Sequence, residues 1–173
     1  MMKEVVLVDR EDREIGREEK IKAHKEGKLH RAFSILIFNS KGELLIQQRN
    51  PEKYHCGGIW ANTCCSHPNP GEDLEAAAYR RLKEECGFDT DLTEKFSFIY
   101  RAEFDNGLVE HELDHVFVGL YEGETKPNPE EVSRMKWIKP TELKKLIENK
   151  PDDFAPWLKI IIEVLDKFGN FEN

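Results

Sequence analysis

Residues 71–88 read GEDLEAAAYRRLKEECGF, and this stretch decides how the fold is interpreted. Acidic residues come first, alanines and leucines follow, and Gly87 stands where a residue in the left-handed conformation commonly ends a helix. The stretch therefore predicts a helix over residues 72–86. At about 100° per residue, Arg81 and Glu85 fall inside the apolar stripe that begins at Leu74.

A cation and a carboxylate inside an apolar stripe have two explanations. The two side chains can form an ion pair across one helical turn while their long stems reach solvent. Alternatively, this face of the helix borders a polar site, because buried charges persist where they are paired or where they bind a metal. Periodicity alone leaves both explanations open.

The rest of the chain combines strand-like and helical segments. Two runs flank SKG and predict a β-hairpin: AFSILIFN (32–39) and ELLIQQR (43–49). FSFIYRAEF (96–104) and LVEHELDHVFVGLY (108–121) flank DNG and predict a second hairpin, and SRMKWI (133–138) predicts another strand. Apolar residues at helical spacing from Trp157 onward predict a terminal helix. These elements indicate an α+β fold.

The composition limits the partners and the location of the protein. A chain of 173 residues with 39% apolar content is expected to form one domain over residues 1–173. It has no run of about 18 apolar residues and no secretory pattern at its N-terminus, so we expect a cytoplasmic protein without a membrane segment. The net charge of -8 disfavours nucleic acid and anionic lipid as partners, and an anionic ligand then needs locally placed cations.

The segment VEHELDHVF (109–117) places acids at every second position. In a strand, Glu110, Glu112 and Asp114 then point to one face. Taken by itself, this pattern favours a solvated acidic face of an antiparallel sheet. The alternative is a metal site of mixed imidazole and carboxylate ligands, if histidines from elsewhere converge on these acids. The candidates distant in the sequence are His24, His30 and His67.

Residues 62–68 read NTCCSHP and bring two adjacent cysteines close to a histidine. The stretch could be a metal clip, a redox pair, a nucleophile with its base, or simple packing. The cysteines show no CxxC spacing, and a reducing cytosol argues against a disulfide framework. Structural thiols or one reactive thiol remain. The four cysteines are Cys56, Cys64, Cys65 and Cys86.

The stretch 71–88 resembles the signature of the Nudix superfamily. That signature is a glycine, five further residues, a glutamate, seven further residues, and then Arg-Glu-apolar-any-Glu-Glu-any-Gly-apolar. Here the opening glycine is replaced by Ser66, and the glutamate after the arginine is replaced by Arg81. In Nudix hydrolases that glutamate helps to hold the metals that activate water, so Arg81 argues against diphosphate hydrolysis. The matching positions are Glu72, Arg80, Leu82, Glu84, Glu85, Gly87 and Phe88.

Four further motifs, NTCCSHP, RAFS, YRAEF and VEHE, resemble the type 1 isopentenyl-diphosphate isomerases of this superfamily. The resemblance covers roughly residues 3–160. It implies a Nudix-like α/β/α sandwich with mixed, largely antiparallel sheets flanked by helices. It also implies an isomerase of isoprenoid biosynthesis that interconverts isopentenyl diphosphate and dimethylallyl diphosphate through a carbocation-like intermediate.

The resemblance implies a role for each of four catalytic residues. Cys65 and Glu112 would transfer protons on opposite faces of the substrate, and the direction of each transfer stays open. Tyr100 would hold Glu112 in position, and Trp157 would lie over the cation. From spacing alone, Tyr100 and Trp157 are equally well explained as apolar packing residues.

The resemblance also implies two metals and a small-molecule prenyl diphosphate as the partner, in a monomer or homodimer. A Mg²⁺ carried on the diphosphate would meet Glu85 and the backbone near Cys65. A second divalent ion, Mn²⁺, Zn²⁺ or Mg²⁺, would bind a site of histidines and glutamates. The implied ligands of this ion are His24, His30, His67, Glu110 and Glu112. The implied diphosphate-binding residues are Lys20, Arg49, Lys53 and Arg81.

Two other functions stay open at the level of the sequence. A Nudix-type diphosphate hydrolase would use Glu72, Glu84 and Glu85, which are intact. A non-catalytic module would bind structural zinc, although the spacing of its ligands matches no standard zinc site. Its ligands would be Cys56, Cys64, Cys65 and His67. The sequence suggests no role for His55, His111, Asp114 or His115.

Overall fold

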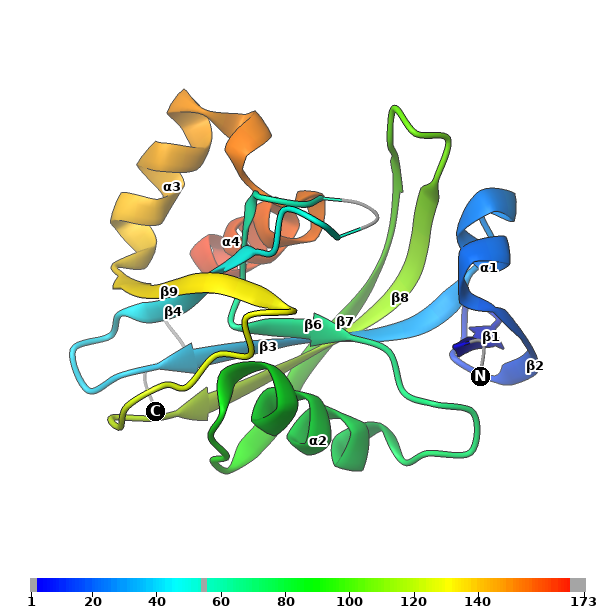
Figure 1. Ribbon diagram of the computed structural model, residues 1–173, viewed down its shortest axis with the longest axis horizontal. Coiled ribbons are helices and arrows are strands. Elements are labelled where there is room, and N and C mark those ends of the chain that lie inside the picture. The colour runs from blue at the N-terminus through cyan, green and yellow to red at the C-terminus, as the bar shows by residue number, and fades with distance from the viewer. Residues whose placement is uncertain (1–2, 54–55, 169–173) are drawn as a thin grey trace.

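A computed structural model describes residues 3–53 and 56–168 of the chain (Figure 1). Its centre is a mixed sheet in which β2, β1, β3, β4 and β5 are successive neighbours. The strands are β1 (Glu4–Val8), β2 (Glu14–Glu19), β3 (His30–Phe38), β4 (Leu44–Arg49), β5 (Trp60–Ala61), β6 (Cys64–Ser66), β7 (Leu92–Glu103), β8 (Val109–Leu120) and β9 (Val132–Ile138). The helices are α1 (Lys20–Glu26), α2 (Leu74–Cys86), α3 (Pro140–Asn149) and α4 (Pro156–Phe168), with a short 3-10 turn η1 (Pro151–Asp153).

Helix α2 confirms the helix predicted from residues 71–88. Its first turn is capped by Asp73, whose side chain accepts a hydrogen bond from the backbone N–H of Ala76 at 3.0 Å. Gly87 ends the helix with φ of 79°, and its N–H donates to the carbonyl of Lys83. A Cβ at Gly87 would also lie 2.4 Å from the carbonyl oxygen of Lys126. Glycine is therefore needed at this end of α2 for its conformation and for the close approach of residue 126.

The first predicted hairpin is confirmed, but its two strands pair only next to the turn. The turn exists, because the Asn39 N–H donates to the Glu43 carbonyl at 3.0 Å. Beyond it, however, β3 and β4 pair only at Phe38 and Leu44. Strand β3 pairs instead in parallel with β8 and antiparallel with β6, while β4 pairs with β9. A strand buried on both faces, such as β3, is typical of the middle of a sheet.

The second predicted hairpin is confirmed and is longer than predicted. Strand β7 begins at Leu92 and pairs with β8 along its length, with a bulge between Glu94 and Phe96. The strand predicted at residues 133–138 corresponds to β9, and the terminal helix corresponds to α4. Helices α1 and α3 and strands β1 and β2 were not predicted.

Helices cover both faces of the sheet. Figure 1 shows α2 on one face and α3 and α4 on the other. The apolar cluster on the α2 side includes Phe33, Ala78 and Leu82, and the cluster on the α4 side includes Leu158 and Ile161. This layering confirms the expected α+β sandwich. Among the described residues, no helix is both long enough and apolar enough to cross a membrane.

Candidate active site

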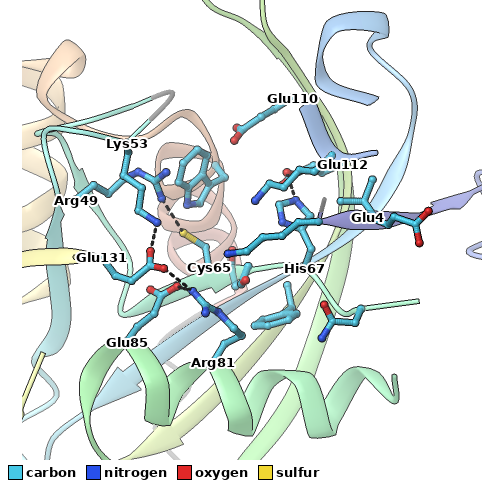
Figure 2. Close-up of a pocket in the computed structure, with 18 of the residues that line it drawn as sticks. Glu4, Arg49, Lys53, Cys65, His67, Arg81, Glu85, Glu110, Glu112 and Glu131 are labelled. Carbon is cyan, nitrogen blue, oxygen red and sulfur yellow. Dashed lines mark hydrogen bonds and ion pairs between the residues drawn. The ribbon is translucent and has the colours of Figure 1, made fainter. Parts of the chain in front are cut away.

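A cavity of about 430 Å³ opens between the sheet, α2, α4 and the N-terminal strand (Figure 2). It is lined by residues from Lys3 to Trp157, so elements from almost the whole described chain build it. Two of the predicted site residues, His24 and His30, are buried behind its wall. The predicted residues that line the cavity are Lys20, Arg49, Lys53, Cys65, His67, Arg81, Glu85, Tyr100, Glu110, Glu112 and Trp157.

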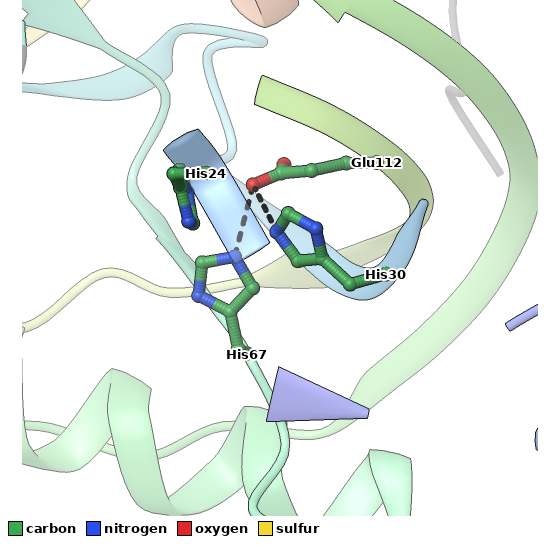
Figure 3. Close-up of side chains that lie close together, drawn as sticks. All are labelled: His24, His30, His67 and Glu112. Carbon is green, nitrogen blue, oxygen red and sulfur yellow. Dashed lines mark hydrogen bonds and ion pairs between the residues drawn. The ribbon is translucent and has the colours of Figure 1, made fainter. Parts of the chain in front are cut away.

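Three histidines and one glutamate converge beside this cavity (Figure 3). His24 comes from α1, His30 from the start of β3, His67 from the segment after β6, and Glu112 from β8. One ligand atom from each lies within 4.8 Å of the others. The convergence expected for these histidines is therefore present, whereas Glu110, also named as a ligand, is not part of this group of four.

The orientation of the imidazoles fits a bound cation. Nδ1 of His24 lies 2.7 Å from the Lys20 carbonyl, and Nδ1 of His30 lies 2.8 Å from the Lys28 carbonyl. These hydrogen bonds through Nδ1 turn each Nε2 toward the cluster. Nε2 of His30 lies 3.4 Å from Oε1 of Glu112, and Nε2 of His67 lies 2.9 Å from the same oxygen. A divalent ion at this place could be coordinated by these nitrogen and oxygen atoms.

Burial disfavours proton uptake by two of the three histidines. It lowers the pKa of His24 to about 4 and holds the pKa of His67 well below its usual value. Burial alone would raise the pKa of Glu112, but His67 and His30 outweigh it and hold that pKa well below normal. Imidazoles together with a carboxylate are a donor set that Mn²⁺ and Zn²⁺ accept.

The acids of β8 are not on a solvated face, contrary to the simplest interpretation of their spacing. Glu110, Glu112 and Asp114 are 3%, 6% and 1% exposed, because their face of β8 is covered inside the sandwich. The hydroxyl of Tyr100 lies 2.7 Å from Glu112 Oε2 and 3.0 Å from Glu110 Oε2, since Tyr100 is the cross-strand partner of Glu112. Burial and the neighbouring charge of Glu112 raise the pKa of Glu110 to about 8. The expected hydrogen bond between Tyr100 and Glu112 is therefore present.

Cys65 lies on the short strand β6, opposite Ser34 of β3. Its sulfur points into the cavity, and Nη1 of Arg49 lies 3.8 Å from it (Figure 2). Burial raises the pKa of the Cys65 thiol to about 12, and the charge of Arg49 opposes this shift. The thiol therefore holds its proton at neutral pH. Cys64, the adjacent residue, is fully buried in the apolar cluster beneath α2.

Trp157 combines the two roles that the sequence left open. It is 3% exposed and belongs to the apolar cluster under α4, yet one side of it lines the cavity. Its Nε1 donates to Asn62 Oδ1 at 2.9 Å, which fixes the ring. Arg49 lies over this ring, 5.4 Å from its centroid, and Tyr100 lies 6.5 Å away. Two aromatic side chains thus line the cavity that Cys65 and Glu112 also line.

The opposite end of the cavity is lined by paired charges. Arg81 forms an ion pair with Glu85, and both side chains line the cavity, so both explanations of the anomaly in α2 hold. Arg81 also contacts Glu84 at 2.7 Å and Glu131 at 3.3 Å. Lys53 pairs with the same Glu131. The four predicted diphosphate-binding residues all line the cavity: Lys20, Arg49, Lys53 and Arg81.

Sequence reasoning missed several residues of the cavity. Glu131 stands in a charged loop with no pattern to single it out. Asn62 could have been noticed, because a buried amide in NTCCSHP needs a partner. Gln47 also contributes, since its amide donates to the Thr63 carbonyl at 2.8 Å and to Glu85 at 3.3 Å. These polar side chains fix the position of the residues around them.

The remaining histidines of the sequence lie elsewhere or outside the described residues. His111 Nδ1 lies 3.0 Å from the Gly27 carbonyl. His115 lies between Glu94 and Asp12, at 2.6 and 3.1 Å, on the other face of β8. Asp114 accepts a hydrogen bond from Ser34 at 2.7 Å. His55 falls outside the described residues.

The structure gives no support to a zinc site of cysteines. Within residues 3–53 and 56–168, the group of side chains that could hold a metal contains His67 but no cysteine. Cys64 and Cys65 are adjacent on a strand, so their side chains point to opposite faces, one into the cluster beneath α2 and one into the cavity. Two such thiols cannot bind one ion together.

Comparisons with known proteins agree with this geometry. The NUDIX domain model matches residues 28–158. The chain is 51% identical to isopentenyl-diphosphate Delta-isomerase 2 of Photorhabdus laumondii, over 93% of this chain and 91% of that protein. It is 46% identical to isopentenyl-diphosphate Delta-isomerase 2 of Aromatoleum aromaticum, over 94% and 86%. A solved structure of a Deinococcus radiodurans protein superposes with a TM-score of 0.79 at 19% identity, over 94% of this chain and 98% of that chain, which shows a shared fold.

Proposed function

Because the chain belongs to the NUDIX-domain family of isopentenyl-diphosphate Delta-isomerases, we propose that its cavity interconverts isopentenyl diphosphate and dimethylallyl diphosphate. One observation carries the proposal: the Cys65 thiol and the Glu112 carboxylate enter the same cavity from different strands. We further propose that residues 1–173 act as one domain, since the cavity draws residues from both ends of the described chain.

Cys65 and Glu112 are the two proton-transfer groups in this proposal. Moving the double bond requires a proton to be added at one carbon and another to be removed from a neighbouring carbon. At neutral pH the Cys65 thiol holds a proton and Glu112 is ionised, so the pair starts with one proton to give and one site to receive. Tyr100 fixes the Glu112 carboxylate through its hydrogen bond.

The aromatic side chains and the enclosed site protect the positive intermediate. Trp157 and Tyr100 line the cavity, and an aromatic ring stabilises a cation over its face by about 2 kcal/mol when water is excluded. Exclusion of water matters, because water would trap a carbocation as an alcohol. Arg49, stacked on Trp157, is held at the edge of this space, where its charge can meet the diphosphate.

The diphosphate is proposed to bind at the cationic end of the cavity. Lys53 and Arg81 lie at that end, Lys20 and Arg49 also line the cavity, and guanidinium groups suit phosphate oxygens. Glu85, buried beside Arg81, would meet a Mg²⁺ carried on the diphosphate. Arg81 stands where a Nudix hydrolase has a metal-binding glutamate, so its cation favours retention of the diphosphate over its hydrolysis.

His24, His30, His67 and Glu112 are proposed to hold a second divalent ion, with Glu110 beside them. Three imidazoles favour Mn²⁺ or Zn²⁺ over Mg²⁺, which prefers oxygen ligands. When bound, this ion would fix one oxygen of Glu112 and lower the basicity of that carboxylate.

The proposed setting is a small prenyl diphosphate as the partner, without nucleic acid or membrane, in a cytoplasmic monomer or homodimer. The four cysteines are all free thiols, which supports a reducing compartment.

The test is incubation with isopentenyl diphosphate, Mg²⁺ and Mn²⁺ in D₂O, with NMR to follow deuterium into the allylic product. Wild type is expected to give labelled dimethylallyl diphosphate, and Cys65→Ala is expected to lose about 10³-fold or more in turnover. Cys64→Ala is the matched control, because it removes the adjacent thiol that faces the apolar cluster. Release of phosphate or diphosphate without isomerisation would instead support a hydrolase, and near-normal turnover of Cys65→Ala would refute its role.

A further inference from the structure

We infer that Glu131 is a positioning residue for the diphosphate: its carboxylate takes the place of anionic oxygens between Lys53 and Arg81 until the substrate arrives. The inference rests on the proposed function and adds one residue to it. Glu131 lies in the loop that precedes β9, and its carboxylate faces the cavity (Figure 2).

The contacts of Glu131 are those of a phosphate substitute. One oxygen lies 3.3 Å from Nη2 of Arg81, and the other accepts a hydrogen bond from the Lys53 ammonium. The two cations come from different segments, α2 and the loop after β4. A phosphate group would present two oxygens to the same pair of donors. The side chain of Glu131 is 18% exposed, so solvent screens these contacts only in part.

The backbone holds Glu131 in this place independently of its side chain. The carbonyl of Glu131 accepts a hydrogen bond from the Asn50 N–H at 3.0 Å, which ties it to the segment that bears Lys53. Asn128, three residues earlier, donates its N–H to the Glu85 carbonyl at 2.9 Å, which ties the same loop to α2. The Asn50 side chain also donates to the Pro129 carbonyl at 2.8 Å. The carboxylate is thus positioned from both sides of the cation pair.

This arrangement has a consequence for binding that a purely structural role does not share. An incoming diphosphate needs the donors that Glu131 already uses, and the two anions repel each other. Glu131 therefore keeps Lys53 and Arg81 directed into the cavity but weakens the binding of the diphosphate. Removing only its charge should strengthen diphosphate binding, whereas loss of a structural support would weaken it.

The experiment measures the affinity of inorganic diphosphate by calorimetry at one fixed concentration of free Mg²⁺. The variants are Glu131→Gln and the matched control Glu130→Gln, an exposed glutamate of the same loop that changes the net charge equally. Glu131→Gln is expected to lower the Kd about fivefold, with a smaller effect at high salt, and Glu130→Gln to leave it unchanged. An unchanged or higher Kd in Glu131→Gln, or an equal decrease in Glu130→Gln, would overturn the inference.

Thermal unfolding of the same proteins separates positioning from support. Without diphosphate, Glu131→Gln should unfold at a lower temperature, since Lys53 and Arg81 lose a shared counter-ion. With diphosphate, its Tm should rise by more than that of wild type. A lower Tm without this larger rise would make Glu131 merely structural.

Isomerisation by the wild type, measured in parallel, tests the proposed function by itself. If the wild type does not isomerise the substrate, the proposed function is refuted. If it does, but Glu131→Gln shows no gain in affinity for diphosphate, only the inference about Glu131 is refuted.

Discussion

Two groups of three acids face different surroundings in this molecule. Three acids along helix α2 and just before it have guanidinium partners. Arg80 binds Glu72 through two hydrogen bonds of 2.6 and 2.8 Å, Arg80 and Arg81 share Glu84, and Arg81 binds Glu85. On strand β8, Glu110 and Glu112 share the Tyr100 hydroxyl, and Glu112 lies beside the imidazoles of His30 and His67. The helix group is Glu72, Glu84 and Glu85, and the strand group is Glu110, Glu112 and Asp114.

The difference shows which group still needs a cation. Glu72 and Glu84 are partly exposed and already paired with arginines, so they serve mainly to hold the helix and its loop, whereas Glu85 lines the cavity. The β8 acids are buried: Glu112 accepts a hydrogen bond from Tyr100 and Asp114 accepts one from Ser34, and burial raises the pKa of Asp114 well above its usual value. A bound divalent ion would offset the cost of burying these carboxylates. Arg81 thus neutralises acids of α2, whereas Glu112 of β8 lies in the cluster of histidines that could hold a metal.

The strongest test of this difference makes the same substitution, Glu to Gln, in both groups of acids. Glu112→Gln keeps the size of the side chain but removes its charge, so turnover is expected to fall by about 10³-fold or more. Glu84→Gln, on the helix, is expected to change turnover by less than about threefold, since its side chain is 46% exposed and only pairs with arginines. The measurement is deuterium incorporation by NMR in D₂O. Equal losses in the two variants would show that both groups of acids take part in catalysis.

A second prediction concerns the metal that the strand group needs. His67→Ala removes an imidazole from the cluster beside Glu112, so metal content is expected to fall from about one ion per chain to near zero, with about 10²-fold loss of turnover. Mass spectrometry of dialysed protein measures the metal. His111→Ala is the control, because His111 also lies on β8 but contacts the Gly27 carbonyl instead. Full metal content in His67→Ala would remove His67 from the site.

The local features of both regions could be predicted from the sequence, but their pairing could not. Helix α2 was predicted almost to the residue, because an N-cap, a helical stripe and a terminal glycine are all local signals. The alternation in β8 correctly predicts that its acids share one face, but it favours a solvated face, whereas the structure buries these acids. Alternation shows that residues share a face and does not show what covers it. The elements that pack on that face are distant in sequence, such as α4 with Trp157.

The candidate site owes more to resemblance than to spacing. The histidines of the cluster lie on three separate segments, and only the parallel pairing of β3 with β8 brings His30 level with Glu112. No local pattern contains that register. Neither spacing nor resemblance predicts a role for Glu131. Its proposed role depends on two backbone hydrogen bonds that fix its loop. Long-range contacts of this kind are what a single sequence does not reveal.

The α2 and β8 sides of the cavity also differ in their cations, and the expected effect on activity is smaller than that of the acids. The arginines on α2 keep their charge at every working pH, whereas burial lowers the pKa of Lys20, on the β8 side of the cavity, to about 8. Lys20 is charged below that pH and neutral above it, so the KM for isopentenyl diphosphate should rise up to about tenfold as pH passes upward through 8. A pH profile of kcat/KM measures this. Lys20→Arg should lose the rise, and a wild-type profile that stays flat to pH 9 would contradict it.

The smallest expected effect concerns Glu72, the acid just before α2 that a hydrolase of this fold would use for metal. Here it accepts two hydrogen bonds from Arg80 and one from the Asn69 N–H at 2.8 Å, so its role is to hold the loop before α2. Glu72→Gln should lower the free energy of unfolding by only about 0.5–1 kcal/mol, because the pair is partly exposed, and should leave turnover within about twofold. Urea unfolding and the D₂O assay measure the two quantities. Glu75→Gln, an exposed change on the same helix, is the control. If Glu72→Gln loses much of its turnover while metal stays bound at the histidine cluster, the α2 group of acids also takes part in catalysis. The proposed difference between the two groups of acids would then be wrong.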